Sequence, residues 1–204
     1  MGNGQSQVEE VDGVPYLVHP RCLAKVVYSA NVSQKFSTVV PVVLLHDCIS
    51  SVDDALQLIN RFADVDDVYS PSFSSIAVLC SRTGKGLSRE PSSTGPYFLR
   101  DGGIHQAYRL YEDTLDSSIF GVIPLDLLSP EAYVPLDLLS PNGLWKRIAV
   151  PSRLYTVRTS ETPLAGAHMG IKDIFRLKGT QTTMMSRPWI ELYDPDGQSA
   201  DYTK

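Results

Sequence analysis

The sequence is poor in cysteine and has no long apolar run. It contains three cysteines, an odd number without a CxxC pair, and its longest apolar run, Val39 to Leu45, is too short to span a bilayer. No apolar segment follows the first methionine. These absences argue against a disulfide scaffold and a helical membrane protein. They predict a reduced, cytoplasmic protein with Cys22, Cys48 and Cys80 buried in its core.

Patterns that bind metals and cofactors are also missing. Gly84-Lys85-Gly86 lacks the GxxxxGK[ST] spacing of a phosphate loop, and no GxSxG nucleophile elbow is present. The histidines are spread along the chain without an HxxxH pair, at His19, His46, His105 and His168. We therefore expect no zinc site, no other metal and no cofactor.

The charge of the chain is negative and unevenly spread. A net charge of −5 gives no general attraction to nucleic acid. Residues 1–141 carry 9 basic and 17 acidic side chains, whereas residues 142–204 carry 9 and 6. This change predicts a flexible N-terminus at residues 1–11, an accessory α/β domain at 12–141, and a second unit at 142–204.

Membrane binding is not expected, although residues 1–6 fit the N-myristoylation pattern. One acyl chain binds a bilayer only marginally, and the usual helper is a basic patch. Here Glu9, Glu10 and Asp12 follow, and an anionic leaflet would repel them. Nothing in the sequence specifies an oligomeric state.

Apolar patterning predicts an α/β or α+β arrangement for residues 12–141. A helix is expected to begin at Ser51, with Asp54 as its capping partner. Its apolar face is expected to comprise Ala55, Leu58, Ile59 and Phe62. A second helix is expected over Ile104–Tyr111, and residues 82–96 should form a flexible loop. Strands are expected at Val14–Val18, Thr38–Leu45, Ser75–Cys80 and Ile119–Ile123.

One internal repeat is present. Residues 123–133 read IPLDLLSPEAY and residues 134–144 read VPLDLLSPNGL, with seven of eleven positions identical. Two copies do not make a solenoid. We expect a local tandem duplication in which one copy fills the native position and the other forms an apolar loop. Only one of the pairs Leu127/Leu128 and Leu138/Leu139 should then be well buried.

A lysine lies within an unusually apolar stretch. Residues 162–189 read TPLAGAHMGIKDIFRLKGTQTTMMSRPW, with Lys172 between Ile171 and Asp173. Burying an ammonium is costly, and such burial lowers the pKa of a lysine and allows it to act as a base. From the residues alone, a salt-bridged or snorkelling surface lysine is the preferred interpretation, and a catalytic base is the alternative.

This stretch resembles the start of the amidase-signature family. In that family a proline-leucine-glycine lead enters a strand that ends in the catalytic lysine-aspartate pair. A lysine-glycine turn and paired threonines follow. The matching positions are Pro163, Leu164, Gly166, Gly170, Lys172, Asp173, Lys178, Gly179, Thr182 and Thr183. Met185 stands where the family often has glycine or asparagine. The resemblance implies that Lys172 is the catalytic lysine.

Four upstream segments resemble the extra N-terminal domain of certain fungal amidases and occur in the same order. They carry no known chemistry in those proteins. Their positions are Val14–Tyr16, Asp66–Ser70, Gly95–Phe98 and Ile148–Tyr155. The resemblance therefore covers most of the chain from Val11 onward.

The family mechanism needs more than the lysine. Amidase-signature enzymes hydrolyse small-molecule amides with a Ser–cis-Ser–Lys triad, in which the lysine acts through the bridging serine on the nucleophilic serine. The family's two serines belong to a glycine- and serine-rich segment downstream, and no such segment lies between Lys172 and Lys204.

We therefore expect the N-terminal fragment of an amidase, inactive alone, in which residues 142–204 form the truncated start of the mixed-sheet amidase fold. Within such a fragment, Lys172 should lie on or beside a buried strand, which the chain leaves at Asp173, and be partly exposed or paired with a carboxylate such as Asp173. The alternative is a non-catalytic binding or assembly module that carries an amidase remnant.

Overall fold

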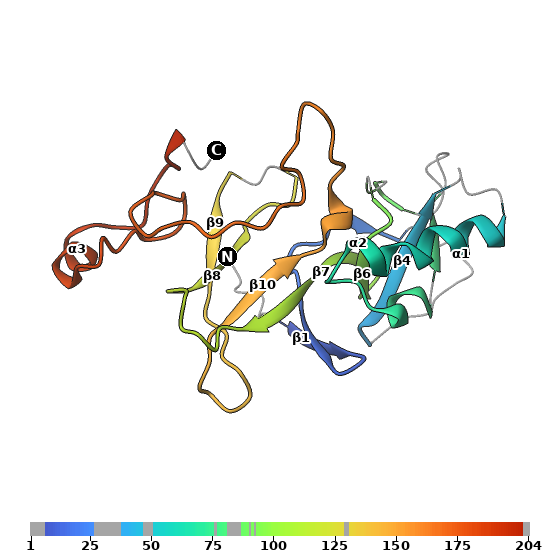
Figure 1. The fold of residues 1–204 in the computed structure, drawn as a ribbon, viewed down its shortest axis with the longest axis horizontal. Coiled ribbons are helices and arrows are strands. Elements are labelled where there is room, and N and C mark those ends of the chain that lie inside the picture. Colours follow the sequence, from blue (N-terminus) through green and yellow to red (C-terminus); the bar gives the residue numbers. More distant parts are fainter. Residues whose placement is uncertain are drawn as a thin grey trace. The chain divides into compact units, whose positions relative to one another are not determined.

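The computed structural model describes residues 7–26, 38–46, 51–75, 77–80, 87–89, 91, 93–128 and 131–201 (Figure 1). The fold is mixed α/β and consists mostly of strands, with few helices. The coarse prediction of an α/β or α+β chain is therefore confirmed. Among the described residues, no helix has the length and hydropathy that crossing a bilayer requires.

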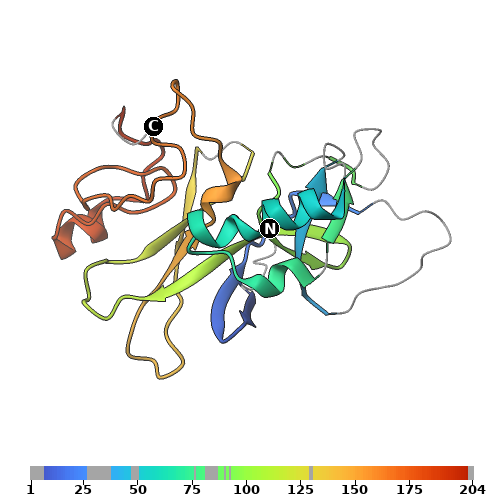
Figure 2. The same ribbon diagram turned by 45° about the vertical axis from the view of Figure 1, so that its right-hand side comes forward.

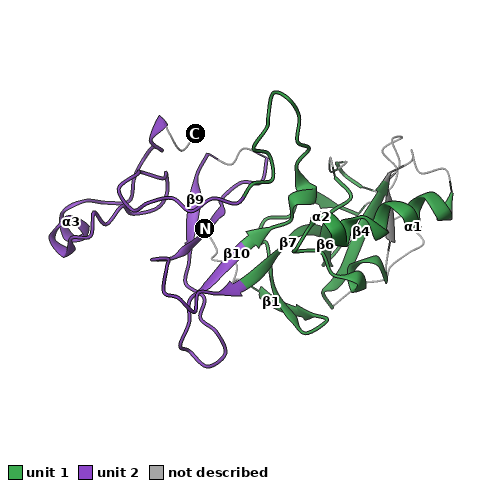
Figure 3. Cartoon of the chain, in the orientation of Figure 1, with its two compact units in different colours: residues 1–110, 150–167 green, residues 111–149, 168–204 purple. Residues whose placement is uncertain are grey.

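The chain divides into two compact units (Figure 3). Unit 1 contains residues 1–110 and 150–167, and unit 2 contains residues 111–149 and 168–204. The domain boundary predicted at residues 141/142 falls within unit 2, in a turn where Gly143 has a positive φ of 73°. The predicted division into an accessory and an amidase-like domain stays a prediction.

One curled sheet dominates the fold, with strand order β1-β2-β7-β6-β4-β5. Strands β3 and β10 pair with β7 beside that path. The pairs β1–β2, β2–β7, β3–β7, β6–β7 and β4–β6 are antiparallel. The pair β4–β5 is parallel and is connected through helices, because parallel neighbours need a long crossover. The strands are β1 (Gln7–Val11), β2 (Val14–Val18), β3 (Ala24–Lys25), β4 (Val40–His46), β5 (Ala77–Cys80), β6 (Pro96–Arg100), β7 (Gly103–Glu112) and β10 (Arg147–Pro151).

Three of the four expected strands in this region correspond to β2, β4 and β5, and the fourth, at Ile119–Ile123, to β8 (Gly121–Pro124). The N-terminus expected to be flexible contains a strand, because residues 7–11 form β1. The turn Asp12-Gly13, with φ of 52° and 75°, joins β1 to β2 in register. Asp-Gly at two positive φ values is the preferred two-residue hairpin turn.

The predicted helix at Ile104–Tyr111 is wrong, because this segment is the ten-residue strand β7. Its start is set by a second hairpin turn, Asp101-Gly102, with φ of 50° and 73°. β7 pairs with β2, β6, β3 and β10 and is therefore central in the sheet. A central strand covered on both faces has apolar residues in succession, and that composition can imitate the spacing of a helix.

The sheet of unit 1 has a hydrophobic cluster on each face. On one face Val43 and Phe98 pack with Phe62, Val68 and Phe73. On the other face are Ala24, Val42, Leu44, Leu87, Tyr97, Leu99 and Ile104. Successive residues of β4 and β6 thus point to opposite faces, as strand geometry requires.

Helix α1 (Val52–Asn60) covers the first of these faces together with the short α2 (Phe62–Val65) and the 3-10 helix η1 (Pro71–Ser75). Figures 1 and 2 both show α1 lying along the sheet beside β4. Ser51 caps the helix by accepting a hydrogen bond from the Asp54 amide at 3.1 Å, as predicted. Ala55 and Phe62 are buried, and Leu58 and Ile59 partly so, which confirms the predicted apolar face.

The cysteine prediction is wrong for Cys22, which is an exposed free thiol. Cys22 follows β2 in an irregular stretch, where its Sγ donates to the carbonyl oxygen of Ala24 at 3.0 Å. Cys48 and the side chain of Cys80 lie outside the described residues, as do residues 82–86, 90 and 92 of the loop predicted at 82–96.

The repeat of unit 2 forms a two-stranded sheet rather than one strand and one loop. Strand β8 pairs with β9 (Tyr133–Leu136), and Ile123 of the first copy lies opposite Val134 of the second. Leu128 and Leu139 are 54% and 53% exposed, so neither leucine pair is well buried and the expectation of one buried pair is wrong. Each copy contributes a strand because its apolar start can pair with the other copy.

Unit 1 contains two buried histidines, His19 and His105, that are joined by a hydrogen bond. His105 on β7 donates through Nδ1 to the carbonyl oxygen of His19 at 2.8 Å, and His19 Nδ1 accepts from the Arg21 amide. The His19 ring lies 5.4 Å from that of Tyr108. Within the described residues no group of three metal-binding side chains occurs. These histidines are therefore held by structural contacts.

Burial lowers the pKa of His105, although the bond to His19 and the nearby Asp101 partly oppose this. The unfolded chain has the usual histidine pKa of about 6.5. Below about pH 6.5 the unfolded state binds more protons than the folded state. The free energy of unfolding should therefore decrease as the pH is lowered, until the pH is below the folded-state pKa of His105. Above about pH 6.5 this contribution is fully present.

We expect His105→Asn, whose amide can still donate to His19, to reduce the loss of stability between pH 7 and pH 5. Denaturant unfolding at both pH values measures this change. His168→Asn, at an exposed position, is the control and should retain the wild-type pH dependence. An unchanged pH dependence in the His105 variant would contradict the assignment.

Candidate functional site

Lys172 lies in an irregular segment of unit 2. Residues 168–176 contain no strand, so the expectation of a buried strand ending at Lys172 is wrong. The carbonyl oxygen of Lys172 instead closes a local turn by accepting from the amides of Ile174 and Phe175, at 2.8 and 3.0 Å. A backbone committed to this turn cannot continue a strand through position 172.

The Lys172 side chain is exposed, and so are its apolar neighbours Met169, Ile171, Ile174 and Phe175. Within the described part of the chain its ammonium makes no hydrogen bond or ion pair. The expectation that Lys172 is not sealed in an apolar cavity agrees with this position. The expected alternative, a pair with Asp173, does not occur.

Asp173 binds the second half of the motif. Its carboxylate accepts from the backbone amide of Thr183 at 2.9 Å and from the Thr183 hydroxyl. The neighbouring hydroxyl of Thr182 donates to Asp196 at 2.6 Å. Asp173 of the Lys-Asp pair is therefore joined to Thr183, ten residues later, by charge-assisted hydrogen bonds. Such bonds are stronger than those between neutral groups.

Gly179 occupies a position that only glycine fits. Its φ is +89°, and a Cβ atom built there would overlap with the carbonyl oxygen of Tyr133. The close approach is fixed by two backbone bonds, from Tyr133 to Lys178 at 2.8 Å and from Gly179 to Asp196 at 2.9 Å. The lysine-glycine turn of the motif thus has a steric reason in this fold.

Two methionines follow the threonines in strained conformations. Met184 and Met185 have φ of 49° and 53°. This is the left-handed region, which residues other than glycine, asparagine and aspartate adopt only rarely. Met185 is also 81% exposed, so packing does not compensate for the strain. The turn therefore favours the glycine or asparagine that the amidase-signature family often has here.

Replacing Met185 by glycine is expected to raise the free energy of unfolding of unit 2 by about 0.5–1 kcal/mol, because glycine adopts positive φ without steric cost. Both tryptophans, Trp145 and Trp189, belong to unit 2, so denaturant unfolding followed by tryptophan fluorescence reports it. Met185→Ala should give no such gain. Equal stability of the two variants would argue against backbone strain at this turn.

In unit 1, the four upstream segments singled out from the sequence come together. The Tyr16 hydroxyl donates to the carbonyl oxygen of Val68 at 2.7 Å. The Asp66 carboxylate accepts from the Ser152 hydroxyl at 2.6 Å and from the Arg153 amide at 3.0 Å. Segments 14–16, 66–70 and 148–155 are thereby joined through hydrogen bonds, most of them buried.

The fourth segment, 95–98, joins this network through Tyr155 at the end of the 3-10 helix η2 (Arg153–Tyr155). The Tyr155 hydroxyl donates to the carbonyl oxygen of Pro96 and accepts from the Ala107 amide at 2.8 Å. Burial, with a contribution from Tyr97, raises the pKa of Tyr155 well above its usual range. Its hydroxyl stays protonated and serves as a structural crosslink.

Gly95 lies against the Tyr155 ring, where a Cβ would meet ring carbons at 2.5 and 2.8 Å. Tyr97 completes this contact, with its ring 5.2 Å from that of Tyr155. The sequence alone indicated no function for these segments. The structure shows that their polar residues connect distant parts of unit 1.

No protein-family model matches the sequence, and no solved structure matches the fold. The family resemblance therefore depends on the motif residues between positions 163 and 183 and on the four upstream segments. Among the motif residues, Asp173, Gly179, Thr182 and Thr183 each have a contact that explains the residue type. The side chains of Lys172 and Lys178 make no such contact in the described residues.

Proposed function

We propose that this chain is the N-terminal part of an amidase-signature hydrolase in which Lys172 serves as the base of a Ser–cis-Ser–Lys triad. The observation that supports the proposal is the contrast within the motif. Asp173, Thr182 and Thr183 are engaged in side-chain hydrogen bonds. The Lys172 side chain is exposed and has no partner in the described residues, and the half-buried Lys178 has no side-chain partner there either. A lysine whose backbone is held in a turn and whose ammonium group has no hydrogen-bond or ion-pair partner can serve as a catalytic base.

The chemistry that this assignment requires is a relay of one proton. A neutral lysine amine accepts a proton from the bridging serine, which in turn accepts one from the nucleophilic serine as that oxygen attacks the amide carbonyl. Backbone amides then stabilise the oxyanion. Lysine needs an apolar surrounding to stay neutral, and the exposed Met169, Ile171, Ile174 and Phe175 beside it would supply one wall of such a pocket.

The 204 residues do not contain the rest of this machinery. Two serines follow Lys172, and neither lies in a glycine- and serine-rich segment. Ser199 accepts from the Lys178 amide at 3.1 Å, and Ser186 is the N-cap residue of helix α3 (Arg187–Leu192) without a side-chain hydrogen bond to it. The substrate of the complete protein would be a small-molecule amide. The nucleophilic serine of the proposed triad would belong to a part of that protein outside these residues.

The purified 204-residue chain should therefore hydrolyse aliphatic and aryl amides no faster than buffer. Lys172→Ala should leave its free energy of unfolding within about 0.5 kcal/mol of wild type, as for an exposed side chain without partners. Asp173→Ala is the matched control and should cost about 1.5–3 kcal/mol, since it removes the two bonds from Thr183. Amide turnover that Lys172→Ala abolishes in this chain would contradict the proposal.

The second candidate is a non-catalytic binding module. Unit 1 favours it, because this unit folds around its own two-sided core and has a pocket at its sheet edge, described below. The two candidates differ in the expected effect of Lys172→Ala on the complete protein. An amidase loses turnover, whereas a binding module keeps its ligand.

A further inference from the structure

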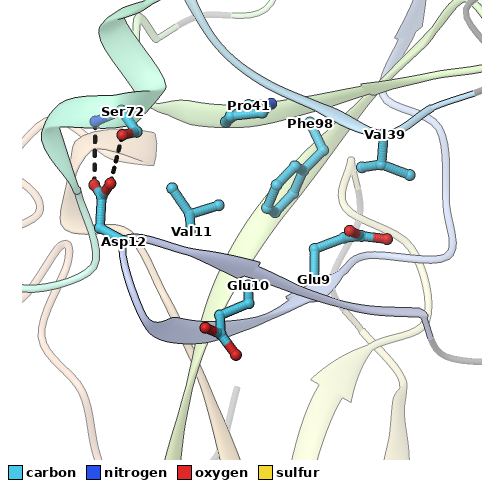
Figure 4. Close-up of a pocket in the computed structure, with 8 residues that line it drawn as sticks. All are labelled: Glu9, Glu10, Val11, Asp12, Val39, Pro41, Ser72 and Phe98. Atoms are coloured by element: carbon cyan, nitrogen blue, oxygen red, sulfur yellow. Dashed lines mark hydrogen bonds between the residues drawn. The ribbon is translucent and has the colours of Figure 1, made fainter.

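A pocket lies between the edge strand β1 and the residues leading into β4 in unit 1 (Figure 4). Its volume is about 230 Å³. Its apolar lining comes from Val11, Val39, Pro41 and Phe98, and Glu9, Glu10, Asp12 and Ser72 complete it. No lysine or arginine is among the residues that line it. The pocket is thus lined partly by apolar side chains and partly by polar ones, with its negative charge at the β1 side.

The side chains of β1 are arranged in the reverse of the usual order. Strand alternation places Gln7 and Glu9 on the same face as the buried Val11, and both are partly buried. Val8, on the opposite face, is 39% exposed. A polar pair therefore points inward while a valine points outward, an arrangement that costs free energy unless the inward polar groups are hydrogen-bonded.

Glu9 is held in place by a short chain of hydrogen bonds. Arg100 on β6 donates from Nη1 to Gln7 Oε1 at 3.1 Å, and this fixes the Gln7 amide so that its Nε2 donates to Glu9 Oε1 at 2.7 Å. In the described residues Glu9 has no cationic partner and no other bond. One oxygen of an oriented carboxylate is therefore left for a ligand.

The other carboxylates at the pocket do not serve this role. Asp12 accepts from the Ser70 hydroxyl and from the amide and hydroxyl of Ser72, and these bonds lower its pKa. Glu10 is exposed, and Figure 4 shows its side chain pointing away from Phe98 and Val39. Glu9 is the carboxylate that remains available beside the apolar lining.

We propose that this pocket binds a small organic cation with an apolar tail, of the primary alkylammonium class, with Glu9 as the counter-ion. The ammonium would donate to the free carboxylate oxygen of Glu9. The tail would lie against Val11, Val39 and Phe98. The volume is below the range of about 300–1,000 Å³ typical of drug-sized ligands, so a ligand of a few carbons fits.

An inward charge on an edge strand has another known use, which is to prevent sheets from associating edge to edge. That use requires neither a pocket next to the charge nor the fixed orientation of Glu9 through Gln7 and Arg100. It predicts that Glu9→Gln would cause self-association without any change in ligand binding. The two explanations can therefore be separated by experiment.

The test is an NMR titration of the 204-residue chain with n-alkylammonium ions from methyl to pentyl, with 1-pentanol as the neutral probe. Affinity should increase roughly fourfold per added methylene until the pocket is full. 1-Pentanol should bind at least about fivefold more weakly than pentylammonium. Shifts should centre on the amides of Glu9, Val11 and Val39.

Glu9→Gln should weaken pentylammonium binding at least about fivefold. Glu10→Gln, the same charge change on the next residue, should leave it unchanged. Val39→Lys is a second variant, which should abolish binding by placing a tethered ammonium in the pocket.

The proposal is overturned if no saturable binding occurs, if 1-pentanol binds as well as the cation, or if Glu9→Gln binds like wild type. Self-association of Glu9→Gln with unchanged binding would likewise overturn it in favour of edge protection.

Discussion

Asp66→Ala is expected to lower the free energy of unfolding of unit 1 by about 3 kcal/mol, a large share of the stability of a small domain. The carboxylate is 3% exposed and accepts from Ser152, from the Arg153 amide and from the Tyr69 amide, the last at 3.1 Å. Alanine would leave these donors without their acceptor in the folded state, and each such loss carries a desolvation cost.

Asp64→Ala provides the control for this substitution, because Asp64 is exposed and lies two residues earlier in α2. It should change the free energy of unfolding by no more than about 0.5 kcal/mol. Denaturant unfolding followed by far-ultraviolet circular dichroism, which reports the sheet, measures both variants. Similar small losses in the two variants would mean that Asp66 does not connect residues 66–70 with residues 150–155.

Gly179→Ala is expected to destabilise unit 2 by about 2–4 kcal/mol. A methyl group there would meet the carbonyl oxygen of Tyr133, and the φ of +89° is unfavourable for alanine. Either the bond from Tyr133 to Lys178 or the bond from Gly179 to Asp196 must break to relieve the overlap. Amide hydrogen exchange at Tyr133 and Gly179 should therefore accelerate.

Gly170→Ala offers a control within the same motif, because a Cβ at position 170 would meet nothing within 4 Å. Tryptophan fluorescence should show a loss of stability for the position-179 variant and almost none for the position-170 variant. If both variants unfolded at the same denaturant concentration, the close approach of residues 133 and 179 would not exist in solution.

Local sequence signals predicted those elements that are set by local interactions. The cap at Ser51, the apolar face of α1 and the valine-rich β4 each depend on residues close together in sequence. The helix expected at Ile104–Tyr111 failed because apolar residues on both faces of a central strand follow one another closely. The Asp101-Gly102 turn in front of it was a hairpin signal that could have corrected the assignment.

Contacts between residues far apart in the sequence could not be predicted from local sequence signals. Nothing near Asp66 in the sequence indicates that its acceptor atoms are used 86 and 87 residues later, by Ser152 and Arg153. The same holds for Gly179, whose need for glycine arises from a carbonyl oxygen 46 positions earlier. The repeat was misread for a related reason, since pairing between its two copies depends on the whole of unit 2.

At the candidate site, the family resemblance pointed to a set of motif residues. For some of them the structure shows why that residue type is needed. Asp173, Gly179 and Thr183 have contacts that need their residue types, and Met185 occupies the turn where glycine or asparagine would be favoured. The Glu9 pocket was not foreseen. Its signal was available in β1, where a glutamate alternates with Val8 and shares the face of Val11.

The amidase assignment of Lys172 is tested most directly by an amide-hydrolysis assay on two proteins. One is the 204-residue chain, and the other is the longest translation product of the same reading frame, each with and without Lys172→Ala. We predict turnover by the longer product, its loss by at least about three orders of magnitude on Lys172→Ala, and none by the 204 residues. Turnover that survives Lys172→Ala, or a longer product without turnover, would contradict the assignment.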